Sequence, residues 1–437
     1  MTATHLSASS GADTQAGESR AKAWGFTGLL VSLYVVNWAD KAVFGLAAQP
    51  LAKELGLSAS QIGLVGSAFF LAFTIGGFFA GPLNRWMTLK AALVLLAIGW
   101  SVAMLPLVLS ATFTVLLLSR MLLGFLEGPS SALVHTSVFS WHPREKRGLP
   151  AACITASASI AKIAIAPALA ILMATQGWRA AFLVLAAAGV VWAVFWLPTW
   201  RVGPYGTDKA TPASDDDEPV SPWRAVLTTP TFVGGALAVM SMYALVTVVL
   251  TFLPSYFELG LGYSQVQAGT MFAFPSIASL VVMFLLSGVG DRLLARGATS
   301  RVLRGIVPAA GLLVCGLAMT VVPYLGAPVV AVIVVSVGYA FGASVFPLFN
   351  SAISEVVRPR QMANTLGIFL ALMAVGGLVA PYVTGVIVDA AASPADGFAR
   401  AFQIFGAFAV VGALAAMLMV NPERDKARLA GLTRTSL

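Results

Sequence analysis

Five charged side chains fall inside long apolar stretches of the chain. They are Asp40, Lys41, Arg120, Glu127 and Lys162, and all five lie in the first half. An ionised group at membrane depth is costly unless it is paired or hydrated, so such residues are functional candidates by default. Carboxylates can take up protons and cations can attract an anion. The residue types therefore predict a site that handles protons and a negatively charged solute.

The spacing of these residues places them on shared helix faces. Glu127 follows Arg120 by seven residues, so both lie on one face, with Glu127 about 10 Å further along the axis. Asp40 lies at a similar depth to Arg120, and we predict that they form an ion pair, either as a gate or as a static clamp between helices. Thr155, Ser159 and Lys162 follow helical spacing and form one polar stripe, which predicts a helix facing a cavity and not lipid.

The elements that carry these residues are long apolar segments. The chain has 437 residues, of which 58% are hydrophobic and only 10% are charged, whereas a soluble domain carries about 25% charged residues. A membrane-spanning helix needs about 20 apolar residues. The sequence predicts an all-α membrane protein with twelve such helices, at about 24–48, 61–83, 90–110, 113–140, 148–173, 178–198, 230–257, 266–290, 301–324, 326–353, 361–389 and 398–420.

The polar segments divide the chain into parts. We expect a disordered cytosolic tail over 1–22, a six-helix bundle over 23–198, a cytosolic linker over 199–228, a second six-helix bundle over 229–421 and a cytosolic tail over 422–437. The halves echo each other, because the segments that open the sixth and twelfth spans read GWRAAF and GFARAF. Such internal repeats are typical of secondary transporters.

The distribution of basic residues predicts the orientation. Most of the 26 Lys and Arg residues fall in alternate loops and the tails, and the loops of the other side hold only Lys53, Arg179 and Arg400. Cytosolic loops are enriched in Lys and Arg. We therefore expect both termini in the cytosol of a cell with the protein in its inner membrane. The net charge of +8 is then a topology signal and does not indicate nucleic-acid binding.

The twelve-span plan and the loop motifs resemble the major facilitator superfamily. The loop motif between spans two and three is degraded here to AGPLNRWM at 80–87, and the second-half copy keeps Asp291 and Arg292. Within that superfamily the chain resembles the anion:cation symporter family, which includes bacterial sugar-acid transporters and sialin-like carriers. The shared segments are WADK at 38–41, SAF at 67–69 followed by Phe73, Arg120 with EGP at 127–129, and WHP at 141–143 followed by RG at 147–148.

This resemblance implies a proton-coupled importer of organic anions. It implies that Asp40 and Glu127 take up protons, that Arg120 pairs with Asp40, and that Lys41 or Arg120 attracts the substrate. An anion beside these cations disfavours ionised carboxylates, so anion binding and proton uptake should be thermodynamically coupled. His135, two turns beyond Glu127, is a candidate proton relay, or a histidine that merely touches the interface.

The expected substrate contacts are Tyr34, Trp38, Lys41, Phe73, Arg120, Lys162, Tyr243 and Asn350. Trp38 and Phe73 stand where the family has tyrosines, so hydroxyl groups are missing. The sequence therefore favours a less hydroxylated carboxylate, either small or aromatic, over a polyhydroxylated sugar acid. The alternative is that the two aromatic rings only pack or face lipid.

Two other classes stay open at this stage. The chain could be a proton antiporter that exports a drug or metabolite, or a transporter-like sensor that binds a ligand without turnover. We find no nucleotide-binding loop, metal cluster or nucleophile constellation, so we expect neither an enzyme nor a cofactor. We also expect a monomer, with the lipid bilayer, protons and a small organic anion as its partners.

Overall fold

The computed structural model describes residues 5–142, 148–205, 221–357 and 359–435. Helices make up most of these residues, and twelve of the helical segments are long and apolar enough to cross a membrane. The twelve segments agree closely with the predicted spans. The prediction of an all-α membrane protein is therefore confirmed.

The first six spans are built from nine α-helices and one π-helical turn, several spans being broken into two pieces. They are α1 (His5–Leu55), α2 (Ala59–Gly77), α3 (Ala80–Trp86), α4 (Leu89–Leu109), α5 (Phe113–Glu127), α6 (Ser130–Trp141), α7 (Gly148–Ile160), η2 (Ala161–Ile165), α8 (Ala166–Gln176) and α9 (Trp178–Thr199). The fourth span breaks at Gly128 and Pro129, because proline has no N–H to donate to the preceding turn.

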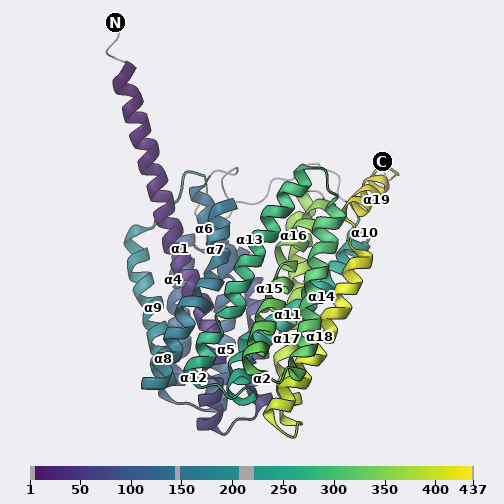
Figure 1. The fold of residues 1–437 in the computed structure, drawn as a ribbon. Helices are drawn as coiled ribbons and strands as arrows, with labels where there is room; N and C mark the ends of the chain where they lie inside the picture. Colours follow the sequence, from purple (N-terminus) through teal and green to yellow (C-terminus); the bar gives the residue numbers. More distant parts are fainter. Residues whose placement is uncertain (1–4, 143–147, 206–220, 358, 436–437) are drawn as a thin grey trace.

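The second six spans follow the same plan. They are preceded by α10 (Trp223–Leu227) and consist of α11 (Pro230–Ser255), η3 (Tyr256–Gly260), α12 (Gln265–Met271), α13 (Phe274–Ala295), η4 (Arg301–Ile306), α14 (Val307–Val321), η5 (Val322–Tyr324), α15 (Pro328–Ala343), α16 (Val345–Val356), α17 (Pro359–Asp389) and α18 (Pro394–Met419), followed by α19 (Pro422–Thr435). Both ends of the chain lie on the same side of the molecule (Figure 1).

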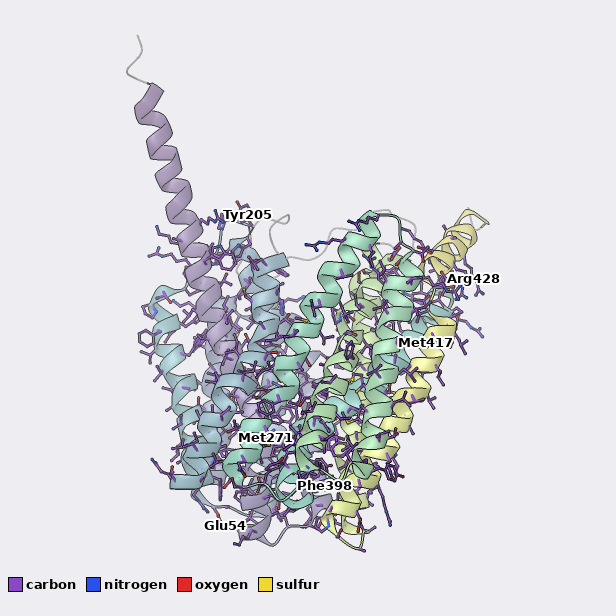
Figure 2. The ribbon with its side chains drawn as sticks, viewed as in Figure 1. Glu54, Tyr205, Met271, Phe398, Met417 and Arg428 are labelled. Carbon is purple, nitrogen blue, oxygen red and sulfur yellow. The ribbon has the colours of Figure 1, made fainter. Side chains whose placement is uncertain are left out.

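The two halves touch each other at the end away from the termini. There α1 packs on α11, α2 on α17, and α8 on α12. Figure 1 shows the helices converging at this end, and Figure 2 places Glu54 there, opposite Tyr205 and Arg428. Glycines allow the close approach: a Cβ on Gly63 would lie 2.9 Å from the carbonyl carbon of Pro381.

A carboxylate of the second half also caps a helix of the first half. Asp389, the last residue of α17, accepts hydrogen bonds of 2.8 Å each from the backbone N–H groups of Ala59 and Ser60. These groups open α2 and have no partner within their own helix. Ser67 of α2 adds a third contact, because its hydroxyl accepts from the Tyr382 N–H at 3.1 Å. The two halves are thus joined by named polar contacts as well as by packing.

The structure differs from the sequence at the N-terminal tail. Helix α1 begins at His5, so residues 5–22 are helical where their composition predicts a disordered tail. The segment contains no proline that would end a helix, and its four alanines, the best helix formers, outnumber its two glycines. The middle of the predicted linker, 206–220, lies outside the described residues.

Candidate functional site

Four of the five predicted charges lie together inside the first half. Asp40 and Lys41 belong to α1, and Arg120 and Glu127 belong to α5. Their exposed fractions are 1%, 6%, 3% and 0%. The cluster holds two carboxylates and two cations, so its formal charges balance.

Lys41 and Glu127 form the ion pair of this cluster. The Lys41 ammonium donates to Glu127 Oε2 and to Asn37 Oδ1 at 2.6 Å. It also lies 5.2 Å from the ring centroids of both Trp38 and Phe73, within the range of a cation–π interaction. Sequence reasoning missed this pair, because it related Glu127 to Arg120 on its own helix and took Lys41 as a substrate contact.

Asp40 and Arg120 are neighbours but do not form the predicted ion pair. The Arg120 guanidinium donates to the backbone carbonyl of Asp40 at 3.0 Å, and its Cζ lies over the rings of Phe44 and Phe69, 4.7 Å and 4.5 Å from their centroids. Both carboxylate oxygens of Asp40 are buried and have no hydrogen-bond partner among the described residues. In this conformation the predicted ion pair is not formed, because the Arg120 guanidinium is bound to the Asp40 carbonyl and lies against two rings; the gating role of the two residues stays a prediction.

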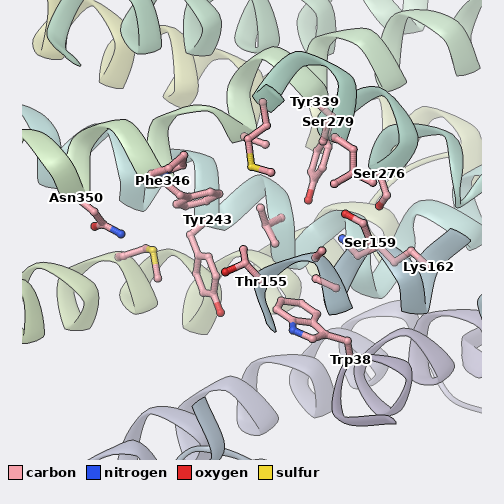
Figure 3. Close-up of a pocket in the computed structure, with 18 of the residues that line it drawn as sticks. Trp38, Thr155, Ser159, Lys162, Tyr243, Ser276, Ser279, Tyr339, Phe346 and Asn350 are labelled. Carbon is pink, nitrogen blue, oxygen red and sulfur yellow. The ribbon is translucent and has the colours of Figure 1, made fainter. Parts of the chain in front are cut away.

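A cavity of about 300 Å³ lies between the two halves. Its first-half wall comes from Trp38 of α1 and from α7 and η2, and its second-half wall comes from α11, α13, α15, α16 and α17. Figure 3 shows the polar side chains of both walls pointing toward one another. The polar lining residues are Trp38, Thr155, Ser159, Lys162, Tyr243, Ser276, Ser279, Tyr339 and Asn350. The predicted stripe of Thr155, Ser159 and Lys162 thus faces a cavity.

Lys162 is the cation of this cavity. It is 7% exposed and sits in η2, a single π-helical turn of a kind that often occurs at functional sites. Pro167, just beyond the turn, cannot donate the usual helical hydrogen bond, which explains why the ladder shifts here. Within the described part of the chain Lys162 forms no ion pair with a carboxylate.

The eight predicted substrate contacts divide between the two places. Trp38, Lys162, Tyr243 and Asn350 line the cavity, whereas Tyr34, Lys41, Phe73 and Arg120 are not among its lining residues. Trp38 connects the two places, because its ring centroid lies 5.2 Å from Lys41 Nζ and 5.7 Å from Lys162 Nζ. One indole ring therefore lies beside a cation of the buried cluster and beside the cation that lines the cavity.

Sequence reasoning missed the second-half hydroxyl groups of the cavity. Ser276 and Ser279 lie on α13 and Tyr339 lies on α15. Uncharged hydroxyls in apolar helices are common, so only the three-residue spacing of Ser276 and Ser279 could have pointed to a shared face. The cavity therefore has more hydrogen-bonding groups than the sequence led us to expect.

His135 lies on α6 and is not a lining residue of the cavity. Its Nδ1 donates to the Ser131 carbonyl at 2.7 Å, and its ring contacts Phe139 edge to face. One ring nitrogen is thus occupied within its own helix. The relay role predicted for it stays a prediction.

The comparisons with known proteins agree with this architecture. The family model of the Major Facilitator Superfamily matches residues 30–381. A hexuronate transporter of Bacillus subtilis (strain 168) is 26% identical over 399 residues, covering 89% of this chain and 92% of that protein. A Cupriavidus necator protein described as a probable sulfoacetate transporter is 26% identical over 419 residues, covering 90% of this chain and 93% of that protein.

The fold also matches solved structures. A bacterial homologue of the human lysosomal transporter Spinster, in an inward-facing and unoccupied conformation, has a TM-score of 0.76 and 18% sequence identity. The match covers 93% of this chain and 98% of that one. This likeness concerns the fold alone.

Proposed function

The chain belongs to the Major Facilitator Superfamily, and on that premise we propose that it carries an organic anion into the cell together with protons. It is a multi-pass membrane transporter and not an enzyme. The relatives named above are described as carriers of hexuronate and of sulfoacetate, which are both anions. The geometry supports two parts of this proposal, the anionic substrate and the coupling to protons.

The orientation belongs to the proposal. The positive-inside distribution of Lys and Arg puts both termini in the cytosol of a cell with the protein in its inner membrane. The end closed by α1–α11, α2–α17 and α8–α12 packing then faces outward. In this assignment residues 23–198 and 229–421 are the two halves that rock about the central cavity.

The single observation that carries the anionic substrate is Lys162. Its buried ammonium lies in the cavity between the halves and is matched by no carboxylate among the described residues. A buried charge without a counter-ion is unfavourable. A bound carboxylate or sulfonate would supply the missing counter-ion at the place where the two halves meet.

Proton coupling rests on the neighbouring charge cluster. Glu127 and Asp40 are balanced by Lys41 and Arg120, so adding one proton gives the cluster a net positive charge. Lys41 and Lys162 lie 5.2 Å and 5.7 Å from the centroid of the same Trp38 ring, so in a low-dielectric interior the added charge favours an anion beside Lys162. By linkage, a bound anion favours proton uptake to the same extent.

The cavity also limits the substrate class. Trp38 and Phe346 offer apolar contact area, while Ser276, Ser279 and Asn350 offer hydrogen bonds. We infer a small organic anion with one principal anionic group at Lys162. Its remaining part can be a short, aromatic or hydroxylated body, since the second-half hydroxyls remove the argument against hydroxyl groups.

Transport into vesicles of known orientation tests the proposal. Labelled D-glucuronate, sulfoacetate and benzoate would be offered to proteoliposomes with and without an inward proton gradient. We expect gradient-driven accumulation of at least one anion. Glu127→Gln should abolish this accumulation while leaving exchange of labelled for unlabelled anion.

Two results would count against the proposal. If Glu127→Gln still accumulates the anion under a pH gradient, Glu127 is not the proton-coupling residue. Glu258→Gln is the matched control, because Glu258 is a glutamate of the second half outside the cavity lining. Gradient-driven extrusion in place of uptake would favour the proton-coupled exporter.

A further inference from the structure

The ammonium of Lys162 lies between two aromatic rings. Its Nζ is 5.7 Å from the ring centroid of Trp38 and 5.8 Å from that of Tyr339, both within the range of a cation–π interaction. Trp38 belongs to α1 of the first half and Tyr339 to α15 of the second. The cation is thus held from both sides of the cavity.

The chemistry of this arrangement differs from that of Lys41. Lys41 is neutralised by Glu127, whereas the rings around Lys162 carry no net charge. Aromatic faces stabilise a desolvated ammonium through their quadrupole without cancelling its charge. Lys162 can therefore stay buried and ordered while its full positive charge remains available to an anion.

We propose that Tyr339 is a positioning residue that, with Trp38, forms an aromatic cage holding the Lys162 ammonium in place for the anionic group of the substrate. This inference rests on the proposed function only in naming a substrate anion as the ligand. The cage is formed by one ring from each half. The benzene ring is the part of Tyr339 that acts, so phenylalanine should replace it and leucine should not.

Chemical labelling of Lys162 tests the cage without any substrate. The full-length protein would be treated with N-hydroxysuccinimidyl acetate at one fixed, mildly alkaline pH, and acetylation of Lys162 followed by peptide mass spectrometry. Tyr339→Leu uncovers the amine and removes a contact that favours its unreactive ammonium form. We expect Lys162 to be acetylated about fivefold faster or more in Tyr339→Leu, since fivefold corresponds to a cation–π contact of about 1 kcal/mol at about 1.4 kcal/mol per tenfold. In Tyr339→Phe the rate should stay within about twofold of wild type.

Lys41 is the internal control, because its ion pair with Glu127 does not involve Tyr339. A general loosening of the site would accelerate acetylation of Lys41 as well, and would show that Tyr339 only packs. Equal Lys162 rates in wild type and Tyr339→Leu, including no acetylation in either, would overturn the cage. A Tyr339→Phe rate equal to that of Tyr339→Leu would overturn it too, since the hydroxyl would then be the acting group.

This test is separate from the test of transport. If no anion accumulates but Tyr339→Leu exposes Lys162, the cage stands and the proposed function fails. If an anion accumulates and the rates are equal, the function stands and the cage fails.

Discussion

The glycine contact between α2 and α17 predicts a variant that shifts the balance between the two conformations of the transporter. In Gly63→Ala the new Cβ would lie 2.9 Å from the carbonyl carbon of Pro381 and 3.0 Å from the Cα of Tyr382, where ordinary contacts are 3.4–4 Å. The obstructing atoms are backbone, so the helices must separate. This strain exists only while the end away from the termini is closed.

The size of the shift follows from the cost of overpacking. Forcing an extra methyl group into a tight contact costs about 1–3 kcal/mol. Alanine also favours the helix over glycine by about 1 kcal/mol, but this gain is the same in both conformations and cancels. At about 1.4 kcal/mol per tenfold, the closed state should lose about fivefold to a hundredfold in population relative to the open one.

Thiol accessibility measures this population. A cysteine at Val246, a cavity-lining position, would be labelled by an impermeant reagent added from the side away from the termini, with Cys153 and Cys315 replaced by serine. Gly63→Ala should raise the labelling rate about fivefold or more. Gly367→Ala on α17 is the matched control, because no atom of the described residues lies within 4 Å of a Cβ at Gly367.

Asp389→Asn provides an independent test of the same closure. It removes the negative charge from a carboxylate that accepts two N–H groups at the start of α2. Because Asp389 is exposed, we expect its substitution to destabilise the closed state by only about 1 kcal/mol. The labelling rate at position 246 should therefore rise less than in Gly63→Ala. Unchanged labelling in both Gly63→Ala and Asp389→Asn, or a rise in the control Gly367→Ala equal to that in Gly63→Ala, would refute the assignment of this end as the closed gate.

Two further predictions concern ion pairs. Lys41→Met leaves Glu127 as a buried carboxylate without its cation and should destabilise the protein by about 3–5 kcal/mol. The double variant with Glu127→Gln should recover most of this loss in thermal unfolding measured in detergent. Equal unfolding temperatures of the single and double variants would contradict the pairing. At Asp425 in α19 burial acts in the opposite direction, but hydrogen bonds from Arg424 and the Thr231 N–H hold its pKa below the usual range. A pKa lowered in the folded state contributes stability at pH values above the unfolded pKa of about 3.9, and this stability is lost as the pH falls. Asp425→Asn should therefore show a smaller acid-induced fall in unfolding temperature than wild type. An identical fall would exclude this role for Asp425.

Much of the architecture could be predicted from the chain alone. The length of each apolar segment sets the number of spans, because a bilayer demands about 20 residues per helix. Helical periodicity placed Thr155, Ser159 and Lys162 on one face, and the structure puts that face against a cavity. Both results depend on properties within single helices, which local sequence specifies.

The pairing of the charges was decided only by tertiary structure. Sequence gives the depth of a residue and the face it occupies, and on these grounds Asp40 was matched with Arg120. The structure instead pairs Lys41 with Glu127 and turns Arg120 to a backbone carbonyl. Adjacent residues such as Asp40 and Lys41 point about 100° apart around a helix. The rotation of α1 about its axis relative to α5 therefore decides which of the two side chains faces Glu127.

The same reason explains the second-half wall of the cavity. Ser276, Ser279 and Tyr339 are ordinary residues of apolar helices until α13 and α15 bring them opposite Lys162. The sequence by itself determined that this chain crosses a membrane twelve times with charges buried in its first half. Only the packing of the two halves decided that the buried Lys162 has no carboxylate partner among the described residues and which rings lie beside it, because those contacts join helices that are remote along the chain.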